Sequence, residues 1–150
     1  MQSILLVGED DAFPMYAEYL RLRGLEIALR TSPSEALDDL ARLSPSVIVT
    51  ELAFRRDPQR GCEFIAAARR HPHGQSGVVI VVTGYGRAQD AALARRCGAD
   101  QFFVTPLLPE ALEQAIEQAL DCLRTGQRPP WNGPTSPLDR RQDSRRKSDA

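Results

Sequence analysis

The chain of 150 residues has 42% hydrophobic and 26% charged residues, which is ordinary for one globular domain with a core of its own. The net charge of -1 conceals an asymmetry, because residues 1–124 hold 13 Lys or Arg against 17 Asp or Glu, whereas residues 125–150 hold 6 against 3. The acidic first part argues against nucleic acid as its main ligand, and no apolar run approaches the roughly 20 residues of a membrane span.

Five apolar runs predict strands, and they alternate with five helical patterns. The first, third and fourth runs are continuously apolar, as expected for parallel strands that are buried on both faces. Ser32 and Glu35 are spaced as a capping box, and Gly24 and Gly98 follow the first and fourth helices as stop signals. The predicted strands span residues 3–8, 25–30, 46–51, 77–83 and 101–104, and the predicted helices span residues 12–23, 33–43, 61–71, 87–97 and 109–124.

This strict alternation predicts the α/β class, with a doubly wound five-stranded parallel sheet between two helical layers, as in flavodoxin-like three-layer αβα folds. Ligands of such sheets bind beyond the carboxyl ends of the strands. We therefore expect the functional site among the polar residues at those ends, which are Glu9, Asp10, Glu51, Thr83 and Thr105.

The composition changes after Arg124. Residues 125–150 contain four prolines and two clusters of basic residues, and Trp131 and Leu138 are their only sizeable apolar side chains. Such a segment cannot bury enough surface to offset the entropy lost on ordering. The sequence therefore predicts a domain over residues 1–124 and a disordered, basic, Pro-rich tail over residues 125–150.

The three cysteines, Cys62, Cys97 and Cys122, are odd in number, widely spaced and without a CxxC motif. This pattern favours free thiols in a reducing compartment over disulfides or a metal site. The residues before the first apolar run lack the basic and apolar regions of a signal peptide. We therefore expect a cytoplasmic location.

Two motifs carry a resemblance to a known family. Gly98-Ala99-Asp100 is followed by an aromatic residue, Phe102, and then by Thr105-Pro106, and the fourth strand ends in Thr83-Gly84-Tyr85-Gly86. Together with the strand pattern, these motifs resemble the receiver domain of bacterial response regulators, the CheY-like fold, over about residues 3–122. The resemblance implies a signalling domain of a two-component phosphorelay rather than an enzyme, with a cis bond before Pro106.

The resemblance also assigns places to individual residues. Glu51 stands where receivers carry the phosphorylated Asp, and Thr83 and Phe102 take the places of the family's switch residues. Gly8 replaces the first of two acidic residues after the first strand, and Thr105 replaces a Lys. A nucleophile moved by one methylene is misplaced for in-line transfer, and a hydroxyl cannot supply the charge of an ammonium group.

These departures predict an atypical receiver, or pseudo-receiver, that acts by protein–protein interaction without phosphorylation. In this family the expected surface for a protein partner or a homodimer is made by the fourth helix, the fifth strand and the fifth helix. The alternative is a weakly functional receiver in which Glu9, Asp10 and Glu51 still hold Mg²⁺. No other cofactor, nucleic acid or membrane contact is implied.

Two further questions stay open at this point. The loop over residues 52–61 carries Arg55, Arg56 and Arg60, which either reach Glu51 and replace the missing Lys or are solvated loop charges. A small nucleotide-binding enzyme is disfavoured, because neither GxGxxG nor GxxxxGK[ST] follows a predicted strand.

Overall fold

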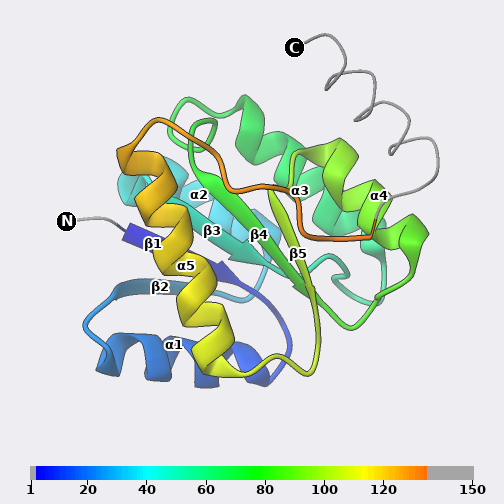
Figure 1. Cartoon of the computed structure of the whole chain (residues 1–150). Coiled ribbons are helices and arrows are strands. Elements are labelled where there is room, and N and C mark those ends of the chain that lie inside the picture. The colour runs from blue at the N-terminus through cyan, green and yellow to red at the C-terminus, as the bar shows by residue number, and fades with distance from the viewer. Residues whose placement is uncertain (1–2, 135–150) are drawn as a thin grey trace, which may run out of the picture.

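A computed structural model describes residues 3–134, which form a five-stranded sheet with helices on both faces (Figure 1). All four strand pairs are parallel, and the strand order is β2-β1-β3-β4-β5. The predicted fold class is confirmed. The elements in chain order are β1 (Ser3–Val7), α1 (Ala12–Leu22), β2 (Glu26–Arg30), α2 (Pro33–Leu43), β3 (Val47–Thr50), α3 (Pro58–Arg70), β4 (Val78–Thr83), α4 (Ala88–Cys97), β5 (Gln101–Val104) and α5 (Pro109–Arg124).

The core has one half on each face of the sheet. Helices α1 and α5 cover one face, and α2, α3 and α4 cover the other. Successive side chains of β1 divide between the two halves, since Ile4 packs toward α1 and α5 whereas Leu5 packs toward α2 and α3. This two-sided burial explains why the strands read as continuous apolar runs.

The helix caps follow the sequence signals in most places. The Ser32 hydroxyl accepts a hydrogen bond from the Glu35 N–H at 3.3 Å, and Gly98 ends α4 with a φ of 118°. Helix α3 begins at Pro58 rather than at the predicted residue 61. The Asp57 carboxylate causes the earlier start, because it accepts a hydrogen bond from the Gln59 N–H at 3.0 Å and so caps the first turn.

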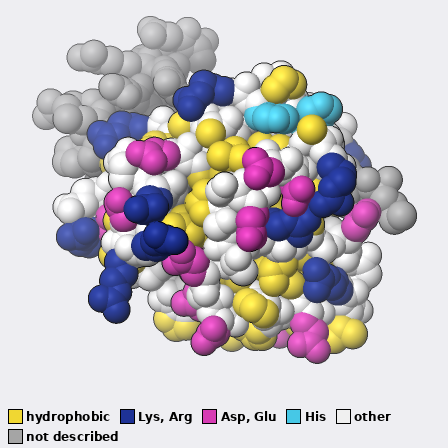
Figure 2. Space-filling model, turned by 180° about the vertical axis from the view of Figure 1, so that it is seen from behind, with side chains coloured by type: hydrophobic (Ala, Val, Ile, Leu, Met, Phe, Trp, Pro, Cys, Tyr) yellow, Lys and Arg dark blue, Asp and Glu magenta, His cyan; other side chains and the backbone are white. Residues whose placement is uncertain are grey.

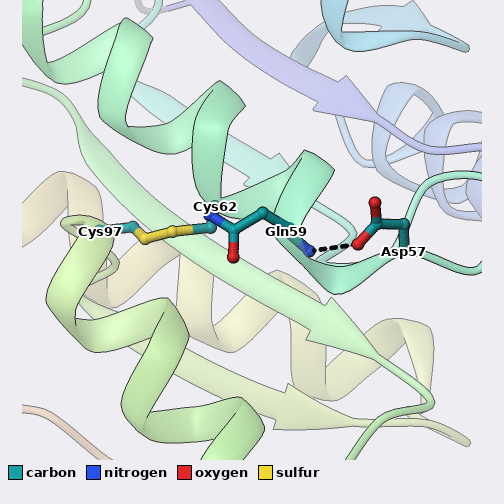
Figure 3. Close-up of a disulfide and its surroundings, with 4 residues drawn as sticks. All are labelled: Asp57, Gln59, Cys62 and Cys97. Atoms are coloured by element: carbon teal, nitrogen blue, oxygen red, sulfur yellow. Dashed lines mark hydrogen bonds between the residues drawn. A yellow bond between two sulfur atoms is a disulfide. The ribbon is translucent and has the colours of Figure 1, made fainter.

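A disulfide between Cys62 and Cys97 joins α3 to α4 (Figure 3). The prediction of free thiols is therefore wrong for two of the three cysteines, and only Cys122 is a free thiol. The sequence spacing gave no sign of the bond, because its 35-residue separation spans an entire strand and the close approach comes from the packing of two helices. The Cα atoms lie 5.4 Å apart, within the range that a disulfide spans.

The chain after α5 also differs from the prediction of a disordered tail. Residues 125–134 run back over the sheet edge, drawn in orange in Figure 1, and Pro129 is buried. Residues 135–150, with the remaining basic clusters of the predicted tail, lie outside the described residues. Within residues 3–134, none of the helices is both long and apolar enough to cross a membrane.

The disulfide predicts a stability that depends on reduction. Closing a 35-residue loop lowers the entropy of the unfolded chain, which corresponds to about 3–4 kcal/mol in the free energy of unfolding. Urea unfolding with and without a thiol reductant should show this loss, and the double variant Cys62→Ser/Cys97→Ser should lose it without reductant. The control Cys122→Ser should keep the response to reductant, and equal urea midpoints in both conditions would contradict the bond.

Candidate functional site

The site lies where the carboxyl ends of β1, β3, β4 and β5 meet. Adjacent parallel pairing places Val7 beside Thr50 at the ends of β1 and β3, so the residues that follow these strands are neighbours. Four of the predicted residues line a single pocket of about 160 Å³, together with Phe13. They are Asp10, Glu51, Thr83 and Thr105.

Glu51 is held by the backbone that follows β1. The N–H of Glu9 donates a hydrogen bond to Glu51 Oε2 at 2.7 Å. Burial raises the pKa of the Glu51 carboxyl above its ordinary value, the charge of Asp10 adds to the rise, and the hydrogen bond from the Glu9 N–H opposes it. Within residues 3–134, no Arg or Lys forms an ion pair with Glu51.

Phe13 occupies the space beside Gly8. A Cβ atom added at Gly8 would lie 2.5–2.8 Å from three ring atoms of Phe13, closer than non-bonded carbon atoms pack. Phe13 is only 1% exposed and belongs to the core between α1, α5 and the sheet, so its ring has little freedom to withdraw. The residue at position 8 therefore has to be glycine while Phe13 keeps this position.

The other two acidic residues are engaged by neighbouring backbone. Glu9 Oε2 accepts a hydrogen bond from the Arg55 N–H at 3.0 Å, and Asp10 Oδ1 accepts one from the Ala12 N–H at 2.8 Å at the start of α1. The Glu9 carboxylate lines a different pocket from the one that holds Glu51. Across the described residues, no three His, Cys, Asp or Glu side chains gather into a group able to hold a metal ion.

The three predicted magnesium ligands are thus not brought together in this arrangement. Mg²⁺ demands near-ideal octahedral oxygen ligands at short distances. Here Gly8 offers no side-chain oxygen, Glu9 is turned to the loop after β3, and only Asp10 and Glu51 share a pocket. The pocket therefore contains two of the three predicted carboxylates, and Glu9 is the one that is missing.

The residues at the ends of β4 and β5 are tied to each other. The Thr83 hydroxyl is buried and accepts a hydrogen bond from the Tyr85 N–H at 3.0 Å. The Thr105 N–H donates to the Thr83 carbonyl at 2.9 Å, and the Thr105–Pro106 bond is cis, as expected. Phe102 lies apart from this pocket and packs instead against Trp131.

The arginines of the loop after β3 point to a second pocket, between α2 and α3. Arg55 and Arg60 line a cavity of about 700 Å³ with Glu9 and Ser32, and neither residue lines the pocket of Glu51. Figure 2 views the face that α2, α3 and α4 cover, where basic and acidic side chains are interspersed. These arginines do not replace the missing Lys.

The loop turns sharply at Arg55 and Arg56. Both residues have positive φ angles, 52° and 64°, and the backbone groups of Phe54 and Asp57 are hydrogen-bonded across them. Two non-glycine residues in this region carry strain, which the surrounding structure has to offset. The turn aims the Arg55 N–H at Glu9, so it helps to hold the Glu9 carboxylate away from Glu51.

Comparison with known proteins places this geometry in a family. The model of the response regulator receiver domain matches residues 4–117. The chain belongs to the response regulator receiver family. Its sheet order, its site at the carboxyl ends of the strands and its Gly98-Ala99-Asp100 motif agree with this membership.

Relatives of this receiver differ in length. An uncharacterised 14.6 kDa protein of Leptolyngbya boryana is 28% identical over 77% of this chain and 88% of its own length. The transcriptional regulatory protein GlrR of Escherichia coli is 30% identical over 78% of this chain, but the match covers 26% of that protein. The CheY-like receiver domain of Methanospirillum hungatei has the same fold, with a TM-score of 0.71 and 22% identity over 81% of this chain and 94% of its own.

Two features of this receiver were missed by sequence reasoning. Phe13 reads as an ordinary core residue of an amphipathic helix, and only its contact with Gly8 reveals its effect on the site. The Arg55 N–H is a backbone group, which no residue pattern marks. The positive φ of Arg55 depends on the fold of the loop. The sequence could have indicated this contact only if Arg55-Arg56 had been recognised as the centre of a tight turn.

The contact of Gly8 with Phe13 predicts a specific double-mutant result. Gly8→Ala should lower the free energy of unfolding by about 1–3 kcal/mol through overpacking, measured by urea denaturation. The cost should shrink in a Phe13→Leu background, because the two positions share one space. Gly84→Ala is the matched control at the same sheet edge, where the added Cβ would meet only Thr105 Oγ1 at 3.5 Å. A cost at Gly8 that is unchanged by Phe13→Leu would contradict the contact.

The raised pKa of Glu51 predicts a pH-dependent stability. The folded state favours the protonated carboxyl, so wild type is not penalised below the ordinary pKa of Glu and loses stability as the pH rises through the raised value. Glu51→Gln keeps an oxygen for the Glu9 N–H and removes the charge. It should therefore stabilise the protein at about pH 7, by less than about 1 kcal/mol because Glu51 is half-exposed, and not below about pH 4. Urea unfolding at both pH values, with the exposed Glu63→Gln as control, decides this; a gain largest at low pH would contradict it.

Proposed function

We propose that this chain is an atypical receiver that signals without being phosphorylated and acts through contacts with a protein partner. The observation that carries the proposal is the ring of Phe13, which fills the place where position 8 would need a carboxylate. A receiver of the ordinary kind needs that oxygen for the metal ion that neutralises the incoming phosphoryl group. A site built around an aromatic ring and a glycine serves a different purpose.

The charges of the site support the same proposal. A phosphoryl group would add negative charge beside Glu51 and Asp10, which line one pocket without a basic partner among the residues that line it. Burial already disfavours the ionised form of Glu51, and the pKa of its carboxyl is raised accordingly. Thr105 contributes only a hydroxyl, so the charge that would build up in phosphoryl transfer has no stabilising cation among the residues that line the pocket.

The proposed partner surface is formed by α4, β5 and α5. Two apolar side chains near its edge are exposed to solvent, Val104 at 43% and Leu108 at 70%. Exposed apolar side chains of this size are common at protein interfaces. We place the domain in a cytoplasmic two-component pathway, as a non-enzymatic component whose output passes to a second protein or to a domain joined to it.

The second candidate is a weakly functional receiver that still senses a phosphoryl group with Mg²⁺. Asp10 and Glu51 favour it, because both line the pocket that also contains Thr83, the switch-equivalent hydroxyl. Two carboxylates and a hydroxyl could hold a metal ion weakly if water supplied the remaining ligands. This candidate predicts saturable binding of the metal ion and of a phosphoryl mimic.

The test is phosphate uptake from a small-molecule donor. The full chain is incubated with Mg²⁺ and acetyl phosphate, and the intact mass is measured without acid treatment. We expect no mass increase in wild type, in Glu51→Asp or in Glu51→Asp/Thr105→Lys, because Gly8 and Phe13 still leave the metal ion without its ligand. A receiver with a complete acidic set serves as the positive control.

An acid-labile phosphoryl group on wild type would overturn the proposal. The second candidate is decided by adding Mg²⁺ with beryllofluoride, a phosphoryl mimic, and recording two-dimensional NMR spectra. Shifts concentrated at Glu51, Thr83 and Asp10 would establish it, whereas an unchanged spectrum would exclude it.

A further inference from the structure

The segment after α5 is bound to the domain from Gln127 to Asn132. We call residues 127–134 the strap. It begins with the Gln127 N–H, which donates a hydrogen bond to the Cys122 carbonyl at the end of α5 at 2.8 Å. From there the strap, orange in Figure 1, crosses the sheet edge towards α4. Its path lies over part of the α4–β5–α5 surface.

The first anchor of the strap is Arg128. Its guanidinium group donates to the Gly77 carbonyl at 2.9 Å and to Asp100 Oδ2 at 3.2 Å. The same oxygen of Asp100 accepts hydrogen bonds from Arg69 at 2.6 Å and from the Val79 N–H at 2.8 Å. Arg128 thus joins a charged network that already holds α3, β4 and the start of β5 together.

The second anchor is Trp131. Its ring packs on the ring of Phe102, with the centroids 6.2 Å apart. The guanidinium carbon of Arg95, a residue of α4, lies 5.3 Å from the centroid of the Trp131 ring. Phe102 is 3% exposed with Trp131 in place. The strap therefore covers an aromatic residue of β5 and contacts a cation of α4 with a single side chain.

The third anchor is Asn132, which binds a backbone N–H at the edge of the sheet. Asn132 Oδ1 accepts a hydrogen bond from the Phe102 N–H at 2.7 Å, and the Gln101 amide nitrogen donates to the Pro130 carbonyl at 3.4 Å. Strand β5 is an edge strand, so its outward N–H groups would otherwise be open to pairing with another chain. The strap satisfies the Phe102 N–H through a side chain and does not pair with β5 as a strand, so a strand added at this edge would replace the contact of Asn132.

The fit of the strap is incomplete at one atom. Gln101 is 3% exposed, and its Oε1 has no hydrogen-bond partner. Gln101 lines a cavity of about 390 Å³ between the strap and α5, together with Phe103, Gln114 and Trp131. A buried acceptor without a donor weakens the docked state, and an occupant that supplied an N–H at this point would bind better.

We propose that the strap is a built-in competitor for the α4–β5–α5 surface, and that a partner binds there by displacing it. The inference rests on the proposed function for the choice of this surface, whereas the docking of the strap does not depend on it. The partner that fits is an extended peptide segment that adds to the edge of β5. It places an aromatic side chain on Phe102, accepts from the Phe102 N–H and donates to Gln101 Oε1.

The first test uses the full wild-type chain and its single tryptophan. Trp131 is the only tryptophan, so its fluorescence reports the strap directly. Docked on Phe102, it should resist quenching by acrylamide and gain accessibility in Asn132→Ala and in Arg128→Ala. The matched control is Gln127→Ala, because that side chain is exposed and only the backbone of Gln127 holds the strap. Full quenching of wild type, at the rate of free tryptophan, would overturn the docking.

The second test offers the strap in trans. A peptide with the sequence of residues 127–134 is titrated into the full-chain variant Trp131→Ala/Asn132→Ala, in which the peptide then carries the only tryptophan. Because a docked strap reduces the binding-competent fraction, the peptide should bind the variant at least about tenfold more tightly than wild type. NMR spectra of the variant should shift at Phe102 and Arg95. A peptide with the Trp and Asn positions changed to Ala should not bind.

The outcomes separate this inference from the proposed function. Equal peptide affinity for wild type and variant, or no binding to a variant whose circular dichroism is native, would overturn the competitor. Phosphate uptake by the wild-type chain would overturn the proposed function and leave the peptide result unchanged. Sedimentation of wild type and of Trp131→Ala/Asn132→Ala identifies the partner further. If the variant dimerises and wild type stays monomeric, the displacing partner is a second copy of the chain.

Discussion

The exclusion of a side chain at position 8 by the ring of Phe13 governs the carboxyl edge of this sheet. Without a side-chain carboxylate at that place, the acidic residues that remain do not converge on one point, because Glu9 and Glu51 line different pockets. Each is satisfied separately by a backbone N–H: Glu51 by Glu9, Glu9 by Arg55 and Asp10 by Ala12. The hydrogen bond from the Glu9 N–H favours the ionised Glu51 carboxylate, but burial outweighs it, so the pKa of that carboxyl stays raised.

The Gly98-Ala99-Asp100 motif of the family lies at the opposite end of β4 and β5, where it has a structural role. The Asp100 carboxylate binds the Val79 N–H, Arg69 and Arg128, and Arg69 also holds the Gly98 carbonyl. Burial lowers the pKa of the Arg69 guanidinium and the charge of Asp100 raises it, so the network compensates its own desolvation. The Asp100 network therefore holds the starts of β4 and β5 in register.

The architecture could be predicted because it depends on patterns that are local in sequence. Continuous apolar runs, caps at Ser32 and a stop at Gly98 specify the elements, and parallel pairing then follows from their alternation. Contacts between distant residues carried no such signal. The Cys62–Cys97 bond and the seat of Trp131 on Phe102 arise only once helices and strands are packed. The composition of the strap predicted disorder, because few of its side chains are apolar. A single tryptophan and a single arginine nevertheless supply most of its contacts with the domain.

The strap also sets an order of events while the chain is being made. Asn132 lies 30 residues beyond the Phe102 N–H that it covers, so β5 leaves the ribosome well before its edge can be closed. At about 5–20 residues per second, this interval lasts roughly 2–6 s, far longer than a strand needs to join a sheet. A nascent domain would therefore spend seconds with an open edge. In that window a neighbouring nascent chain on the same polysome has the same opportunity to pair with β5 as any later partner.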